Sequence, residues 1–299
     1  MKTVAPALAV ALSVALAGSL TAALPARAAD LSTLSRLSQS EFRLLSEDLG
    51  AALSFKPLIP AEALGITGFD VGVAVTATDL KSAQLLSKAS GNQSVPSLLP
   101  APSLRLHKGL PLNIDVGLSY TAAPDTDFSL WGAEARWAFV PGSTLLPAVA
   151  LRGAFTSSSG VSQLKVQTTS ADVSLSKGFA MLTPYAGAGV VWVKSSPAAG
   201  PLLREEKFSV TKVYAGLNVN LGINFAVEAD STGGVLSFGV KAGLRFGAAP
   251  RGDGSGGARA ALGRRSLGAR RPAHLPRQTT PWTRAALGYL PLAASSTRS

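Results

Sequence analysis

The sequence has no cysteine, only two histidines and few charges, with 15% of its 299 residues charged. The missing thiols exclude a disulfide framework, a thiolate zinc site and a cysteine nucleophile. No phosphate-binding loop or cluster of metal-ligating residues is present either, so we expect no cofactor and no metal. The mean hydropathy of +0.27 is unusual for a soluble domain and favours contact with lipid.

The net charge of +11 is concentrated at the ends of the chain. Residues 247–299 carry nine arginines, no lysine and a single acid, Asp253, whereas the central part is nearly balanced. A balanced body offers no basic surface for DNA or RNA, and we expect no nucleic-acid partner.

Residues 1–28 have the pattern of a secretory signal peptide. Lys2 supplies the positive start, Ala7–Leu24 is an apolar run, and Ala26-Arg27-Ala28 resembles a cleavage site. The later uncharged stretches are too short for a transmembrane helix and contain proline. The sequence therefore predicts export without a membrane helix in the mature chain.

The hydrophobic pattern from Phe69 onward has a period of two, which is typical of strands with one apolar and one polar face. In Leu112–Thr121, for example, apolar residues alternate with Asn113, Asp115, Gly117 and Ser119. In 207–221 the apolar positions change face, which predicts a bulge near Lys212. Ten segments follow the pattern, at approximately 69–79, 103–110, 112–122, 129–140, 148–157, 165–179, 184–194, 207–221, 223–230 and 235–246.

Two architectures use such strands: a soluble β-sandwich with an apolar core, and a membrane barrel with the apolar faces on lipid. Small residues dominate the polar faces here, which suits the crowded interior of a narrow barrel. The connections also alternate between short and long, as in up-and-down outer-membrane barrels. We therefore expect an all-β fold, an antiparallel up-and-down transmembrane β-barrel. A secreted β-sandwich adhesin is the alternative.

The last predicted strand, Val235–Phe246, ends in Lys241-Ala242-Gly243-Leu244-Arg245-Phe246. This ending resembles the assembly signal of bacterial outer-membrane β-barrel proteins, carried here by Lys241, Gly243, Leu244 and Phe246. The resemblance covers about 69–246. It implies a porin-like architecture, a place in the outer membrane of a Gram-negative cell envelope, and recognition by the barrel assembly machinery.

The segments on either side of the 65–246 barrel are harder to interpret. Within 29–64, leucines recur near helical spacing and Ser38 with Glu41 resembles a capping box. Single-chain bacterial barrels have even strand numbers, so this segment either lies outside the wall or adds two strands. We expect a periplasmic or plugging helix with ten strands, and twelve strands as the alternative. Residues 247–299 are rich in Gly, Ala, Pro and Arg and are predicted to be disordered.

If the strand registers hold, the lumen contains five positive and five negative side chains that neutralise one another, because charges removed from water must be paired. A barrel of ten strands is close to the size that side chains fill, so we expect a plugged interior or a narrow passive pore. Three outward aromatic residues, Trp131, Trp137 and Phe139, are predicted to form membrane girdles. The charged lumen residues are Asp70, Arg105, Asp115, Glu134, Arg136, Arg152, Asp172, Glu228, Lys241 and Arg245.

His107 is the one histidine of the predicted barrel, and Ser103 shares its face. Envelope lipid-modifying enzymes use such pairs with a carboxylate, which makes an enzyme built on His107 an alternative. We favour a histidine paired to a neighbouring carboxylate. The sequence thus predicts a non-enzymatic outer-membrane barrel, with a structural or pore role and with outer-membrane lipid and the assembly machinery as partners.

Overall fold

The computed structural model describes residues 31–92, 95–122, 127–198 and 202–247. The predicted signal peptide lies outside the described residues, and so does the predicted disordered tail except for Gly247.

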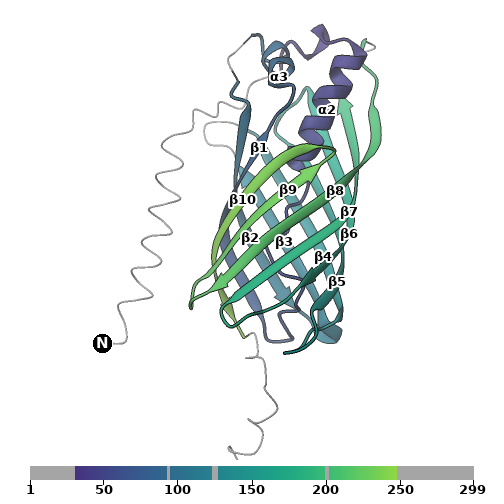
Figure 1. Ribbon diagram of the computed structural model, residues 1–299. Coiled ribbons are helices and arrows are strands. Elements are labelled where there is room, and N and C mark those ends of the chain that lie inside the picture. Colours follow the sequence, from purple (N-terminus) through teal and green to yellow (C-terminus); the bar gives the residue numbers. More distant parts are fainter. Residues whose placement is uncertain (1–30, 93–94, 123–126, 199–201, 248–299) are drawn as a thin grey trace, which may run out of the picture. The chain divides into compact units, whose positions relative to one another are not determined.

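Ten antiparallel strands form one closed barrel in which each strand pairs with its neighbours in sequence, and β1 pairs with β10 to close the ring (Figure 1). This confirms the ten-strand up-and-down barrel. The twelve-strand alternative is wrong, and so is the β-sandwich, since a sandwich needs two open sheets. The strands are β1 (Phe69–Asp79), β2 (Leu98–Gly109), β3 (Ile114–Ala122), β4 (Ser129–Val140), β5 (Ala148–Ser159), β6 (Leu164–Ser176), β7 (Leu182–Pro197), β8 (Glu206–Asn220), β9 (Asn224–Thr232) and β10 (Val235–Phe246).

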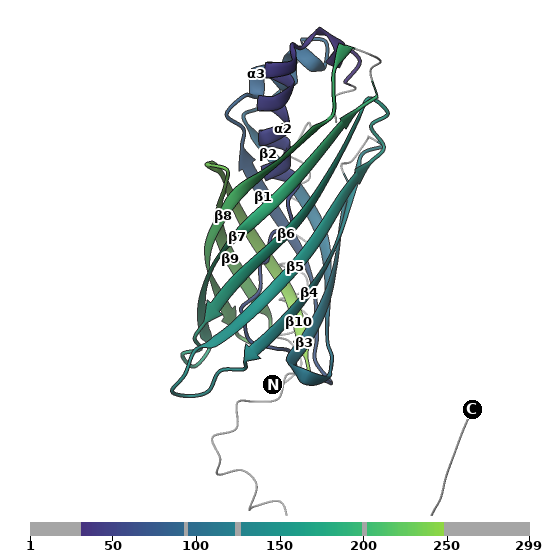
Figure 2. The ribbon, with the colours of Figure 1, turned by 90° about the vertical axis from the view of Figure 1, so that its right-hand side faces the viewer.

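The two ends of the barrel differ. At one end, which we call the turn end, short connections such as η2 (Pro111–Asn113) and residues 221–223 join the strands. At the other, which we call the capped end, the connections include α3 (Ala83–Ala89), and η1 (Leu34–Arg36) packs beside α3. The longer α2 (Gln39–Leu53) runs from the capped end into the ring of strands (Figure 2). None of the described helices is long and apolar enough to cross a bilayer.

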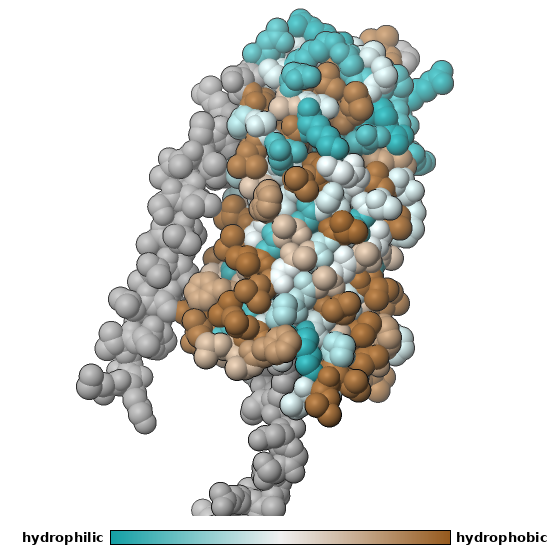
Figure 3. All heavy atoms as spheres, in the orientation of Figure 1, coloured by the Kyte–Doolittle hydropathy of each residue, from teal (hydrophilic) through white to brown (hydrophobic). Residues whose placement is uncertain are grey.

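The apolar faces of the strands point outward. Val116, Trp137 and Phe238 are 38%, 50% and 55% exposed, whereas Asp115 and Arg136 are 1% and 2% exposed. Hydrophilic residues gather at the capped end, and hydrophobic residues are frequent on the wall towards the turn end (Figure 3). The wall is therefore apolar outside and polar inside, the reverse of a soluble β-protein.

β2 begins five residues earlier than predicted, at Leu98. Pro100 and Pro102 made this stretch resemble a loop, because proline cannot donate to a sheet ladder. Pairing of β2 with β3 reaches only to Ser103, so the stretch before it is an edge with β1 as its partner. An edge tolerates proline.

The predicted bulge near Lys212 is wrong. β8 pairs with β7 in unbroken register through Lys212, and its pairing with β9 runs without a shift from Lys212 to Asn220. The apolar pattern changes face because Phe208 and Val210 point inward, where they pack on the cluster formed by α2. An apolar pair can face the lumen only because the helix fills it at this level.

α2 forms where its sequence favours a helix. The Ser38 side chain accepts from the Glu41 amide and the Glu41 side chain accepts from the Ser38 amide, which completes a capping box. Phe42, Leu45 and Leu49 lie on one helical face and are buried. They pack against inward-facing apolar residues of β6, β7 and β8 together with Leu203. The helix is therefore anchored in the mouth by hydrophobic contact.

We predict that Leu45→Ala undocks α2, because Leu45 is fully buried in this cluster. Replacing a buried leucine by alanine typically costs about 2–5 kcal/mol. Hydrogen exchange of the α2 amides in detergent micelles should accelerate accordingly. The adjacent Leu44→Ala is the matched control, since Leu44 is 50% exposed and its loss should cost less than about 0.5 kcal/mol. Equal exchange rates in the two variants would contradict the docking.

Candidate functional site

The charged lumen forms the candidate site. The structure places all ten charged residues predicted for the lumen on the inner face; nine are buried and Arg245 is partly exposed. They come from eight of the strands, which bring them together although their positions span 175 residues of sequence. No group of His, Asp and Glu side chains suited to holding a metal occurs among the described residues.

One ion-pair group joins the first and last strands near the turn end. Lys241 Nζ lies 2.7 Å from Asp70 Oδ1, and Arg245 Nη2 lies 2.8 Å from Asp70 Oδ2. Because β1 and β10 close the barrel, these ion pairs link the two strands on the lumen side of the seam, the β1–β10 junction.

A second group crosses the middle strands. Arg152 Nη2 donates to Asp172 Oδ2 at 2.7 Å, and Arg152 Nη1 lies 3.5 Å from Glu134 Oε2. Arg136 Nη2 donates to Asp115 Oδ2 at 2.5 Å. Removing either member of such a pair leaves an uncompensated buried charge, which is strongly destabilising.

His107 belongs to this group. Its side chain is fully buried, and Nε2 lies 3.1 Å from Glu134 Oε1. Ser103 is four residues away on the same extended strand, about 13 Å along it, and it accepts from Arg105 Nε instead. The structure therefore does not bring Ser103 and His107 together.

Sequence reasoning missed Lys56, Tyr185, Lys212 and Tyr214 as lumen residues, and it left Asp230 out of the charged set although Asp230 lies on the polar face of its strand; all five are buried. Tyr214 and Tyr185 donate to Asp172 and Glu228 at 2.8 and 2.9 Å. Lys212 and Tyr214 have the period-two signal of lumen residues, but the bulge prediction obscured it. No strand pattern could have found Lys56, because it reaches the lumen from a segment outside the wall.

That segment and α2 together form what we call the plug, residues 39–64. After α2 the chain continues through the lumen, and residues 54–61 are all buried. Lys56 Nζ lies 2.8 Å from Asp230 Oδ1 and donates to Ser237 Oγ at 3.1 Å. A cavity between the plug and the β1–β5 side of the wall measures only about 20 Å³, which is room for about one water molecule.

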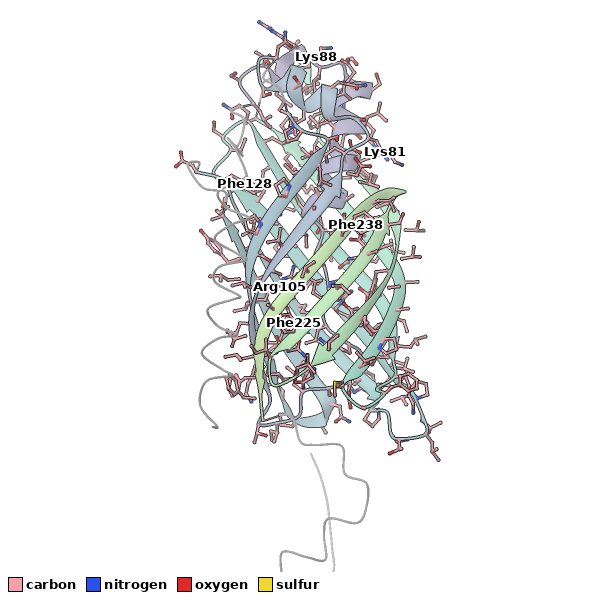
Figure 4. All side chains as sticks on the ribbon, turned by 60° about the vertical axis from the view of Figure 1, so that its left-hand side comes forward. Lys81, Lys88, Arg105, Phe128, Phe225 and Phe238 are labelled. Atoms are coloured by element: carbon pink, nitrogen blue, oxygen red, sulfur yellow. The ribbon has the colours of Figure 1, made fainter. Side chains whose placement is uncertain are left out.

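At the capped end, polar contacts fasten the plug to its surroundings. Lys88 of α3 donates to Glu41 of α2 at 2.8 Å, and Arg43 stacks 3.9 Å from the Phe208 ring centroid. The hydrogen bond from Lys88, together with the Ser38 amide, lowers the pKa of Glu41 from 4.5 to about 2. Figure 4 shows Lys88 and Lys81 at this end, with Phe238 and Phe225 farther along the wall.

The three predicted girdle residues lie on the outer wall. Trp131, Trp137 and Phe139 are each about half exposed. Trp131 packs edge-on against Phe155 and pairs across strands with Tyr120, whereas Trp137 packs near Phe139, with ring centroids 5.8 Å apart. Phe69 and Phe246 pair across the seam at the turn end.

The four residues of the predicted assembly signal lie on β10, which is paired on both sides. Lys241 is buried against Asp70, and Phe246 is exposed on the outer wall. Gly243 allows the close approach of β1, because a Cβ there would collide with the Val71 carbonyl. Leu244 pairs with Val71. Recognition of this strand before it pairs stays a prediction.

We predict that Asp230→Asn strongly destabilises the protein, because it removes the carboxylate that pairs with the buried ammonium group of Lys56. The expected loss in the free energy of unfolding, from urea titration in micelles, is about 3–5 kcal/mol. A second change, Lys56→Met, should restore most of it. Asp79→Asn is the control, since Asp79 is exposed. A loss no larger than in that control would show that the pair does not hold the plug.

We predict that the contact between α2 and α3 weakens in acid. Glu41 has a lowered pKa of about 2, so its contribution is present above its ordinary pKa of 4.5 and is lost as the pH falls to about 2. Carbon-detected NMR titration of the Glu41 carboxyl measures this. In Lys88→Gln the midpoint of the Glu41 titration should rise. In Arg36→Gln, which removes another cation at the capped end, the midpoint should not rise. An unchanged midpoint in Lys88→Gln would contradict the assignment.

No family model matches the chain, and no curated protein matches it. Among solved structures it is similar to the N-terminal β-barrel domain of Pseudomonas aeruginosa OprF, with 13% identity and a TM-score of 0.34 over 61% of this chain and 99% of that one. It is also similar to the outer membrane protein OprG of Pseudomonas aeruginosa, at 8% identity and a TM-score of 0.32 over 63% and 99%. A third similar structure is the outer membrane protease OmpT of Escherichia coli, with 7% identity and a TM-score of 0.34 over 60% of this chain and 95% of that one.

These structural neighbours are bacterial outer-membrane β-barrels, the group that the sequence ending resembles. Identities and TM-scores this low say nothing about activity.

Proposed function

We propose that the protein is an exported, non-enzymatic β-barrel of the bacterial outer membrane that is closed at rest and holds a helical cap at the cell surface. One observation carries the proposal: a closed wall whose exposed outer side chains are apolar and whose inner side chains are charged and buried. The protein serves as a structural barrel rather than as an open pore.

The outer wall supports a lipid environment. Every strand contributes large exposed apolar residues, whereas soluble monomers rarely expose contiguous apolar patches larger than a few hundred Å². Outward aromatic residues lie near both ends, as in membrane girdles. The apolar set includes Val71, Leu104, Leu106, Val116, Leu118, Leu151, Val173, Val213, Val227, Leu236, Phe238 and Val240.

The barrel ends support one orientation. Outer-membrane barrels have short periplasmic turns and longer external loops, so we place the turn end in the periplasm. The chain at Leu31 packs with α3 at the capped end, and from there it descends through the lumen to β1. The capped end, with η1, α3 and the start of α2, then faces the outside of the cell.

The contents of the lumen support a closed state. The plug fills the interior, and wall charges contact it rather than water. An enzymatic role has less support, since His107 is fully buried and distant from Ser103. Recognition of Lys241–Phe246 by the barrel assembly machinery is part of the proposal, because β10 offers an unpaired edge until it pairs with β1.

We predict that the protein shows no conductance steps in planar bilayers, because ions can pass only if the plug leaves. Ser46 Oγ and Ser195 Oγ lie 2.9 Å apart between α2 and β7, so Ser46→Cys with Ser195→Cys can form a disulfide that locks the plug. Any steps seen in the reduced variant should disappear on oxidation. A steady conductance in the oxidised variant would mean that ions pass beside the plug, contrary to a closed lumen.

We predict opposite accessibility of the two ends in intact cells. The natural chain has no cysteine, so Ser35→Cys at the capped end and Leu145→Cys at the turn end each carry one thiol. Both positions are exposed. A membrane-impermeant maleimide should label position 35 on intact cells and position 145 only after lysis. The reverse pattern would overturn the orientation.

A further inference from the structure

At the end of α2 and beyond it, in residues 53–64, the polar contacts between the wall and the plug go mainly to the main chain of the plug. Six wall side chains, from six different strands, bond to backbone groups of residues 53–64. Carbonyl oxygens accept from four of them: Thr156 Oγ1 to Leu53 at 2.9 Å, Lys212 Nζ to Phe55 at 2.6 Å, Arg105 to Lys56, and Arg136 to Pro60 and, at 3.3 Å, to Glu62. Backbone amides donate to the other two: Leu58 to Glu228 at 2.9 Å and Leu64 to Asp115 at 3.1 Å.

These contacts follow the polarity of the peptide main chain. Cations and a hydroxyl meet its carbonyls, while carboxylates meet its amides. Pro57 and Pro60 lack an N–H, so two amides that would need an acceptor inside the lumen are absent. Such contacts recognise the peptide backbone, which all polypeptides have in common, rather than particular side chains.

Within residues 53–64, side chains add a smaller set of polar and packing contacts. Lys56 pairs with Asp230 and Ser237. Leu58 packs where Gly239 leaves room, since a Cβ at Gly239 would lie 2.9 Å from Leu58 Cδ2. Leu58 also has a positive φ of 50°, a conformation that is unfavourable for leucine and is held here by its bond to Glu228.

The wall groups lose partners when the plug is absent. The hydrogen bond of Lys212 goes to the Phe55 carbonyl, and Arg105 bonds to the Lys56 carbonyl and to the neighbouring Ser103. Buried cations without acceptors are costly. An emptied lumen therefore retains groups directed at a peptide backbone.

We infer that the lumen is a binding site for a non-helical polypeptide segment, occupied in cis by residues 53–64, which begin at the last residue of α2. Its ligand class is a peptide with a non-helical backbone, a basic side chain opposite Asp230 and apolar neighbours. The inference rests on the closed lumen proposed above and deepens it: the plug is a tethered ligand that an equivalent peptide can replace.

The test separates the plug from the barrel without removing it during folding. A protease site inserted between Ile66 and Thr67, both exposed, lets the full chain fold first and be cut afterwards. The cut protein in micelles is then incubated with a fluorescent synthetic peptide of residues 39–64. Fluorescence anisotropy measures the replacement of the native segment.

Three peptides distinguish backbone recognition from other modes. The native peptide should bind, and Ile59→Leu, which keeps the side-chain volume, should bind within about tenfold. A peptide methylated at the Leu58 and Leu64 amides should bind about 100-fold more weakly, because each lost bond to a carboxylate accounts for about tenfold or more.

Equal binding of the methylated peptide would overturn the inference. So would failure of the native peptide to bind after urea has displaced the cut segment and has been removed again from a barrel that still resists denaturation on an unboiled gel. Binding in micelles does not depend on conductance or on the orientation in cells. If the peptide fails to bind, the conductance and labelling tests still apply to the proposed function. If those two tests fail, the peptide-binding result can still be interpreted.

Discussion

Backbone hydrogen bonding governs the rest of the structure. A sheet whose outer face meets hydrocarbon has no water to satisfy a free edge, so its amides and carbonyls must pair within the protein. The pairing of β1 with β10 removes both edges. Closure then encloses the second face of every strand, and in this ten-strand barrel the buried residues 54–61 of the plug occupy the enclosed space.

The enclosed face creates the second requirement. Charges removed from water need partners, and the wall supplies some of them, as Asp70 does for Lys241 and Arg245. Others, including Lys212 and Arg105, contact carbonyls of the plug. The plug is thus both the filling of the barrel and a source of acceptors for its wall. Near the capped end it changes character, and α2 meets an apolar stretch of the wall instead.

The sequence predicts the wall well because each strand position obeys one local rule, apolar outward and small or polar inward. The bounds of β1, β4 and β10 agree with those predicted. The rule fails where a long-range contact changes the environment. Phe208 and Val210 break the alternation because α2 covers them, and Pro100 and Pro102 sit in a strand because β3 does not reach them. The capping box at Ser38 is local and was predictable. The pairing of Lys56 with Asp230 spans 174 residues, and no local pattern in the sequence predicts a contact over that separation.

The outward orientation of the apolar faces is the central claim, and the tryptophans measure it most directly. The described residues contain Trp131, Trp137 and Trp192, all on the outer wall. Each can be kept as the sole tryptophan by changing the others to phenylalanine, in vesicles whose acyl chains carry bromine. We predict that all three are quenched strongly by the brominated chains and weakly by aqueous acrylamide, whereas an inward probe, Tyr214→Trp, escapes both quenchers. Strong acrylamide quenching of the three native positions without bromine quenching would place the apolar faces in water and contradict the account.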